Sequence, residues 1–466
     1  MRALRLKGLR VFLTVLLVVV GVSSVSAVDW GGSISTTNTF RSVTETSEDE
    51  QFVNGENLVL YLTSDLGPDW EFVGQLGARY DSEEPLFAAD VEKMYFQRNR
   101  EFAPENEQPA GLVGMTTRYG RFLISEPTGR IMSHAIDGAA LILNYVGFEF
   151  YAGAGYTGLI NKEFSRVSMS LQDSTDQEDD DIYFGPRRLL GQLRVSIPEL
   201  LLNQNVVVAF AVQEDMRDPD EVITVDTEPG NADTDDPGGL LDTQYGILAI
   251  DGSLGVPGLF YNAAYALNTG RTLSLVEDDK SESGESYQYE PFQGHMFDGR
   301  VQYFLPRFVS SIFTVGATFT TGDTDYTSFT EGNTKGAATQ FTAVTPGSVG
   351  LVFALQPGNS TTTEVSYSAK PLEGIGVDAL SSLQTEVSYY AFFRSTGKGY
   401  VSVSDVNADE DGSYLGSEVD LAVRLRPFSD FGIGLSGGMF FANDSVMFDD
   451  ANSTDWIARL TASLSF

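Results

Sequence analysis

The chain has 466 residues, a formal net charge of −36 and a sequence pI near 4.2. So acidic a balance excludes the basic face that a nucleic-acid partner requires, and no nucleic acid is expected. The absence of cysteine excludes disulfides and a lipid-attachment site.

The first predicted element is a secretory signal peptide over residues 1–27. Four cations precede an apolar run, 11–22, which is too short to span a bilayer as a helix. Val25–Ala27 then offers small residues at the two positions that a signal peptidase reads. We expect the mature chain to begin near Val28, and loss of the four cations changes its formal charge from −36 to −40.

Residues 28–466 are predicted to form a single transmembrane, antiparallel, up-and-down β-barrel. Period-2 alternation recurs along almost the whole of this region, and after residue 22 no apolar run is long enough for a transmembrane helix. In such strands one face meets lipid and the other meets water. The predicted strands are 29–41, 55–63, 69–80, 90–101, 115–124, 136–145, 147–160, 188–197, 203–213, 240–251, 259–269, 294–304, 311–321, 361–370, 383–394, 414–426, 431–441 and 456–466.

Eighteen strands are an even number, as a barrel with both termini in the periplasm requires. Three of them, 90–101, 115–124 and 136–145, alternate poorly, so the predicted range is 16–18 strands. Short periplasmic turns are expected to alternate with long outer loops, although two inner connections, 102–114 and 371–382, are long for turns.

The last predicted strand, 456–466, is amphipathic and ends in Phe466. This ending resembles the recognition signal of bacterial outer-membrane barrels. It therefore predicts that the barrel assembly machinery is a partner and Phe466 an assembly signal.

The acidic residues concentrate in the predicted outer loops 161–187, 214–239 and 270–293. A solvated, soluble exterior explains them. The alternative is a cation-attracting vestibule, or divalent cations that bridge the loops to surface polysaccharide.

The predicted inner face is nearly balanced, with nine cations against seven anions. Facing rows of opposite charge would favour polar solutes and penalise apolar ones. The alternative is that these residues pair across strands and stabilise the wall. The cations are Arg79, Arg188, Arg194, Arg300, Lys370, Arg394, Arg424, Arg426 and Arg459, and the anions are Glu71, Asp242, Asp298, Glu364, Glu386, Glu418 and Asp420.

The long predicted loop 322–360 has few charges and several apolar residues, among them Phe341, Val344, Leu351 and Phe353. Because an apolar loop in water is costly, we expect it to fold into the barrel mouth and narrow it. Its segment Ser348–Leu355 resembles a strand, but a strand there would break the even count, so we leave it in the loop.

Asn407, Asp409, Asp411 and Glu418 follow calcium-loop spacing, with Asn in place of the first Asp. No helices flank the segment, and strand alternation already explains Glu418, so chance is the preferred explanation.

Other motifs are weaker still. The sequence GAGYTG at 153–158 fits a dinucleotide fingerprint but precedes an acidic loop rather than a helix. His134 and His295 are the only histidines, and neither lies in an obvious hydrolase arrangement. We therefore predict no enzyme activity, no catalytic residue and no cofactor.

Three stretches, 119–143, 313–323 and 414–441, resemble the bacterial outer-membrane porin superfamily, with a pattern most similar to the alginate-export family. They contain a Gly-Arg segment followed by an Asp-Gly strand, a strand ending in Gly-Asp, and a Leu-Gly-x-Glu-x-Asp strand with its hairpin. The resemblance implies an eighteen-strand barrel with an arginine-rich lumen for polar solutes. The matching positions are Arg121, Asp137, Glu418, Asp420, Arg424 and Arg426.

The sequence thus predicts an outer-membrane porin, a water-filled channel for passive diffusion of small polar or charged solutes or ions. One alternative is a dedicated exporter of an anionic, alginate-like polysaccharide. Another is a plugged structural or adhesive surface barrel. Outer-membrane lipid is the expected surrounding, and a homotrimer is one open arrangement.

Overall fold

The computed structural model describes residues 28–42, 50–83, 86–102, 111–168, 171–179, 181–201, 203–217, 242–277, 285–325, 338–448 and 451–466. The predicted signal peptide and most of the acidic loop 214–239 lie outside these residues. In the described part of the chain, no helix is both long enough and apolar enough to cross a bilayer.

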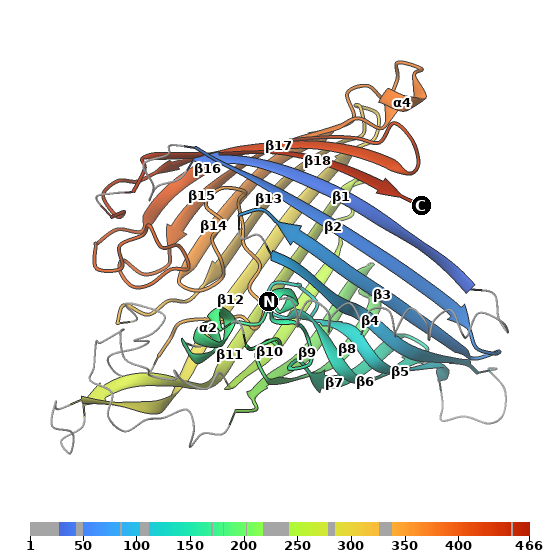
Figure 1. Cartoon of the computed structure of the whole chain (residues 1–466), viewed down its shortest axis with the longest axis horizontal. Helices are drawn as coiled ribbons and strands as arrows, with labels where there is room; N and C mark the ends of the chain where they lie inside the picture. Colours follow the sequence, from blue (N-terminus) through green and yellow to red (C-terminus); the bar gives the residue numbers. More distant parts are fainter. Residues whose placement is uncertain are drawn as a thin grey trace.

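The chain forms one closed sheet of eighteen antiparallel strands in which sequence neighbours pair and β1 pairs with both β2 and β18 (Figure 1). The predicted fold class and strand number are therefore confirmed. The strands are β1 (Val28–Ser42), β2 (Glu50–Asp65), β3 (Trp70–Asp81), β4 (Leu86–Glu101), β5 (Leu112–Ser125), β6 (Ser133–Tyr145), β7 (Phe148–Tyr156), β8 (Arg188–Leu201), β9 (Gln204–Asp215), β10 (Asp242–Ser253), β11 (Leu259–Glu277), β12 (Glu285–Leu305), β13 (Ser311–Thr320), β14 (Ser360–Ala369), β15 (Gln384–Arg394), β16 (Tyr414–Leu425), β17 (Phe431–Ala442) and β18 (Thr454–Ser465).

Several strand boundaries differ from the prediction, among them the end of β7 and the hairpin end of β11 and β12. β7 ends at Tyr156 rather than at 160, where the chain turns into the long connection to β8. β11 and β12 continue as a paired hairpin far into the predicted loop 270–293, which is visible at the lower left of Figure 1.

The two ends of the barrel differ in their connections. At one end, here called the turn end, most links are short, such as 146–147 and 426–430. The opposite, loop end carries 157–187, 321–359 and 395–413, while three of its links, at 43–49, 82–85 and 126–132, are shorter than predicted because the flanking strands run on. Ser348–Leu355 forms no strand and has a single bridge from Val349 to Leu355.

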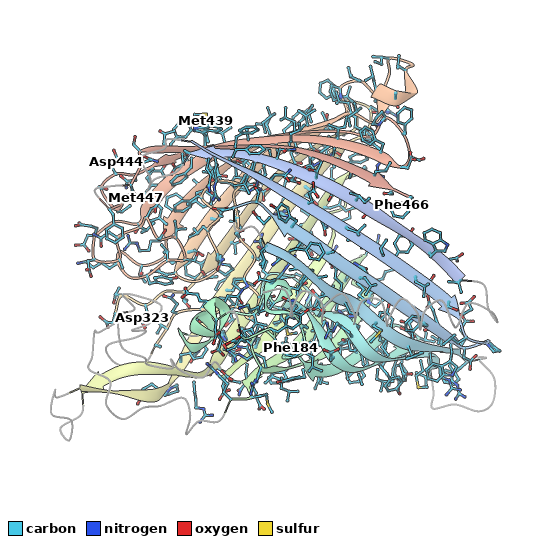
Figure 2. The ribbon with its side chains drawn as sticks, viewed as in Figure 1. Phe184, Asp323, Met439, Asp444, Met447 and Phe466 are labelled. Atoms are coloured by element: carbon cyan, nitrogen blue, oxygen red, sulfur yellow. The ribbon has the colours of Figure 1, made fainter. Side chains whose placement is uncertain are left out.

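Strand register separates an apolar outer face from an inner face. On β16 the outward Val419 and Leu421 are 42% and 48% exposed, whereas their neighbour Glu418 is completely buried. The same alternation leaves large apolar side chains around the whole barrel, visible as the outward sticks of Figure 2. Each would cost about 1 kcal/mol or more in water, so this outer belt is suited to lipid.

The sheet closes where the last residue meets β1. The amide of Gly32 donates to the Phe466 carbonyl at 2.9 Å, and the Phe466 amide donates to the Gly32 carbonyl at 3.0 Å. A Cβ at Gly32 would lie 2.9 Å from the Val59 carbonyl oxygen, so the close approach of these strands favours glycine here. The role of Phe466 in assembly stays a prediction.

A break interrupts the wall between β4 and β5. Their pairing ends at Met94 and Arg121. Toward the loop end, and within the part of the chain that the structure describes, residues 86–93 of β4 pair with β3 alone and residues 122–125 of β5 with β6 alone. A free strand edge in the wall needs another partner for its polar groups.

Arg121 fills this break. Its guanidinium donates to the Asp90 carboxylate at 3.1 Å, to the Val91 carbonyl at 2.9 Å and to the Asp137 carboxylate at 2.8 and 3.0 Å. It also donates to the Leu159 carbonyl at 2.9 Å, which ties the connection after β7 to the wall. One arginine thus supplies a partner for the Val91 carbonyl on the unpaired edge and connects β4, β6 and the connection after β7.

Replacement of Arg121 by alanine should destabilise the barrel by about 3 kcal/mol, because it leaves Asp90 and Asp137 without their buried cation. Urea-dependent unfolding of protein refolded into vesicles measures the change. R121K is the matched control and should recover part of the loss, since it keeps the charge without the fork of donors. Equal stability of R121A and the parent protein would contradict the assignment.

Candidate functional site

The loop-end half of the interior contains an apolar cluster. The alternation pattern of any one strand does not reveal this cluster, because its residues come from several strands and loops. It joins inward side chains of several strands, such as Phe122 and Tyr245, to loop residues such as Ile131, Phe341 and Val344, each at most 1% exposed. Leu123, the residue after Phe122, is 51% exposed on the outer face. Since successive strand side chains point to opposite faces, Phe122 and its cluster lie on the inner face.

Hydrogen bonds to main-chain carbonyls connect three loops with one another and with the wall beside this cluster. The Ser168 amide donates to the Val344 carbonyl at 2.7 Å, and the Thr345 amide donates to the Ile131 carbonyl at 2.9 Å. The Tyr245 hydroxyl donates to the Thr342 carbonyl at 2.6 Å. The described parts of the connections 126–132, 157–187 and 321–359 therefore pack together inside the barrel.

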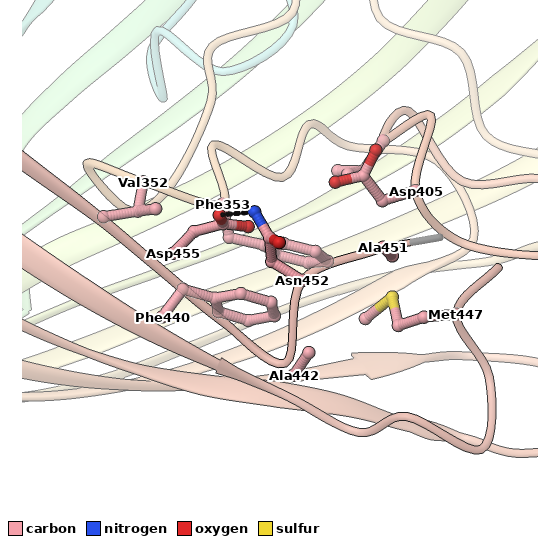
Figure 3. A pocket seen from close by; sticks show the side chains of 10 residues that line it. Val352, Phe353, Asp405, Phe440, Ala442, Met447, Ala451, Asn452 and Asp455 are labelled. Carbon is pink, nitrogen blue, oxygen red and sulfur yellow. Dashed lines mark hydrogen bonds between the residues drawn. The ribbon is translucent and has the colours of Figure 1, made fainter. Parts of the chain in front are cut away.

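A second inner cluster lies against β15, β16 and β17. Phe353 of the long loop stacks on Phe440, with ring centroids 4.1 Å apart and planes 12° apart. A cavity of about 60 Å³ lies beside this stack, with the carboxylates of Asp405 and Asp455 at its sides (Figure 3). The Asn452 amide donates to Asp455 at 3.0 Å.

Glu418 holds the tip of the long loop. Its completely buried carboxylate accepts the amides of Leu351, of Val352 at 2.9 Å and of Phe353 at 2.8 Å. Gly350 precedes these amides with φ +89°, and a Cβ there would lie 2.9 Å from Oε2 of Glu418. Three amides converging on one carboxylate form charge-assisted bonds that fix the loop to the wall.

The remaining inner charges are mostly paired between strands. Arg194 meets Glu149 at 3.0 Å. Arg300 meets Glu364 at 2.8 Å and Arg424 meets Glu386 at 3.1 Å, also between strands. Arg130 of the loop 126–132 meets Asp298 of β12 at 2.7 Å. The side chains of Arg424 and Arg300 keep 60% and 34% of their surface exposed despite these pairings.

Several predicted pore-lining residues lie where no solute can reach them. Arg188 is fully buried with Asp173 and Asp215 beneath the loop end. Arg394 is 1% exposed and donates to carbonyls of the 395–413 loop, among them Asn407. Arg121 lies in the wall break, and Glu418 beneath the long loop. Their inward direction follows from alternation, but their covering by loops does not.

Other predicted residues lie near the interior or outside it. Arg79 donates to the Glu163 carbonyl and lies over the Phe164 ring at 4.9 Å. Arg459 and Asp420 are half-buried on the inner face. Arg426 follows the end of β16 in a turn, outside the barrel wall.

Three charged residues of the interior were not among those predicted from the sequence. Arg118 donates to Gln97 at 2.6 Å and lies 5.7 Å from the Tyr95 ring centre, in a strand whose alternation is poor. Arg130 is in a short loop, where periodicity has no meaning. Glu149, by contrast, could have been found from the alternation of β7.

The calcium-loop spacing is not gathered into a site. Asn407 accepts the Asp409 amide at 3.0 Å, Asp411 lies 3.6 Å from Lys398, and Glu418 is occupied by the long loop. Over the described ranges, no group of three metal-ligating side chains occurs. His134 is buried and its Nε2 accepts the Arg166 amide at 3.0 Å.

No protein-family model matches the chain, and no curated protein matches it in sequence. Solved structures do match. Pseudomonas aeruginosa OpdQ superposes with a TM-score of 0.55 at 10% identity, covering 94% of this chain and 97% of that one. OccK9 (OpdG) and OccK5 (OpdH) of the same organism give 0.54 and 0.51 at 12% and 13% identity, each covering 94% of this chain and 98% of the other.

At such low identity the likeness shows a shared barrel fold. Membership of the porin superfamily stays a sequence prediction. The particular resemblance to the alginate-export family stays a sequence prediction.

Substitution of Glu418 by glutamine should loosen the tip of the long loop. The neutral amide keeps the size but weakens three bonds to the amides, with a cost of about 1.5–3 kcal/mol. A spin label on a single cysteine at Val349 should become more mobile in the variant. E386Q is the matched control because Glu386 lies on the inner face away from this loop. Unchanged mobility in E418Q would contradict the role of Glu418.

Proposed function

We propose that the protein is an outer-membrane channel for passive diffusion of small polar or charged solutes. One observation carries the proposal: a closed eighteen-strand barrel combines an apolar outer belt with an inner face of exposed arginine–carboxylate pairs. An apolar exterior is stable in lipid, and side chains as exposed as that of Arg424 are stable in contact with water.

The inward loops support a narrowed pathway. The apolar clusters occupy the loop-end half of the interior, while Arg300–Glu364 and Arg424–Glu386 line the inner wall. A solute that has passed the loops would meet donors and acceptors of both signs. Such a lining favours polar solutes over apolar ones of the same size.

Two narrower candidates have specific support. Export of an anionic polysaccharide is favoured by the solvent-exposed Arg424, but its track of cations is interrupted by carboxylate partners. A plugged barrel is favoured by the first apolar cluster, because its loops are tied together inside the wall. Measuring which solutes pass through the barrel distinguishes both candidates from a general channel.

The remaining partners follow from this location. Outer-membrane lipid would surround the belt, export would use the predicted signal peptide 1–27, and the barrel assembly machinery would recognise the strand that ends at Phe466. Divalent cations would bind the acidic outer loops, and a homotrimer is the arrangement to test first by cross-linking.

Swelling of proteoliposomes in a series of neutral sugars tests the proposal. Swelling should be rapid with the smallest sugar and should slow steeply with size. Liposomes containing folded barrel that swell no faster than protein-free liposomes would favour the plugged barrel instead.

Removal of the hairpin Ser348–Leu355 should widen the pathway, because the Val349–Leu355 bridge and the Glu418 contacts place this hairpin inside the wall. We expect larger sugars to enter the liposomes several-fold faster. A deletion of similar length in the outer part of the β11–β12 hairpin serves as control. Equal rates for larger sugars in the two deletions would contradict the constriction role of the loop.

A further inference from the structure

The connection 370–383 between β14 and β15 is unusual for the turn end. It is longer than the flanking turns 306–310 and 426–430 and contains a short helix, α4 (Asp378–Ser381). Figure 1 shows it standing out sideways from the barrel wall, at the end where the C-terminus lies. Closing a hairpin does not require such a projection.

The projection is held by both neighbouring turns. The Lys370 amide donates to the Val309 carbonyl at 2.7 Å, and the Ser310 hydroxyl donates to Glu373 at 2.8 and 3.0 Å. On the other side the Ser382 hydroxyl donates to the Arg426 carbonyl at 2.8 Å. Three adjacent connections therefore form one surface.

This surface exposes large apolar side chains. Ile375, Val377 and Leu380 of the projection are 49%, 47% and 37% exposed. Phe308 and Phe428, on the flanking turns, are 64% and 65% exposed. An apolar patch of this kind is stable only against lipid or another protein.

The same three connections carry three exposed cations, Arg307, Lys370 and Arg426, and two exposed carboxylates, Glu373 and Asp430. Elsewhere at the turn end, Arg98 and Arg100 instead lie 3.7 Å from Asp69. Apolar side chains beside cations match the boundary between acyl chains and phosphate headgroups. The patch also continues the outer belt, which reaches the ends of β13 and β14 through Phe313 and Tyr367.

We propose that residues 370–383, together with Phe308 and Phe428, form a contact surface for the phospholipid leaflet at the turn end. The apolar side chains enter the headgroup boundary, and the three cations meet lipid phosphate. The inference rests on the proposed location of the barrel in a membrane. It adds an anchor that lies along the membrane surface beside the strands that cross it.

Depth-dependent quenching tests this surface. The chain has no cysteine, so V377C provides a unique site for an environment-sensitive dye, and I375C provides a second. The labelled protein is reconstituted into phosphatidylethanolamine and phosphatidylglycerol vesicles. Two quenchers of the dye emission are compared. One is a lipid that carries a nitroxide near its headgroup, and the other is iodide in the water on both sides of the vesicle membrane. L421C reports the outer belt, and D65C reports an exposed polar position at the turn end.

We expect the dyes at 377 and 375 to lose as large a fraction of emission to nitroxide lipid as the dye at 421, and to resist iodide. The dye at 65 should show the reverse. Iodide quenching at 377 and 375, with lipid quenching retained at 421, would overturn this inference and leave a periplasmic protein as the partner. Loss of lipid quenching at 421 would instead contradict the membrane location itself.

Discussion

The structure depends on one constraint: every backbone polar group in a lipid-facing wall must find its partner within the protein. Closure of β1 on β18 meets this requirement around the circumference, and the mutual bonds of Gly32 and Phe466 complete it at the end of the chain. Where β4 and β5 separate, the Arg121 guanidinium donates to the Val91 carbonyl on the unpaired edge and also binds the connection after β7 at Leu159. The break is therefore a site where side-chain chemistry replaces sheet geometry.

A second consequence concerns the interior. An eighteen-strand barrel encloses more space than its own inward side chains occupy, so loops can fold inside it. Here they enter with apolar residues and are fixed by a few strong polar contacts. Glu418 holds one loop tip by three amides, and Arg188 holds the buried carboxylates of Asp173 and Asp215. Arginines and carboxylates thus hold the loops in place near the loop end. Elsewhere on the inner face the same residue types form solvent-exposed ion pairs.

The strand pattern was predictable because alternation is local. All eighteen strands were expected near their observed positions, and the inward direction of Arg188, Arg394 and Glu418 followed from the same rule. Their burial was not predictable, because it depends on loops that return from distant positions in the chain. Arg121 shows the limit most clearly. The strand 115–124 alternates poorly, and this pattern did not reveal the break in pairing with β4. The residues that Arg121 binds there, Asp90 and Leu159, are far apart in sequence. The inward folding of the 322–360 loop was expected from its apolar residues, whereas its joining to 126–132 and 157–187 was not.

The central claim is that a continuous water-filled path remains past these loops. Single-channel recording of the refolded, otherwise unmodified protein in a planar lipid bilayer tests it most directly. The account predicts discrete, stepwise current openings that scale with salt concentration, because ions would move along the arginine–carboxylate pairs of the inner wall. An insulating bilayer, containing barrels verified as folded and inserted, would contradict it and would mean that the inner clusters seal the lumen.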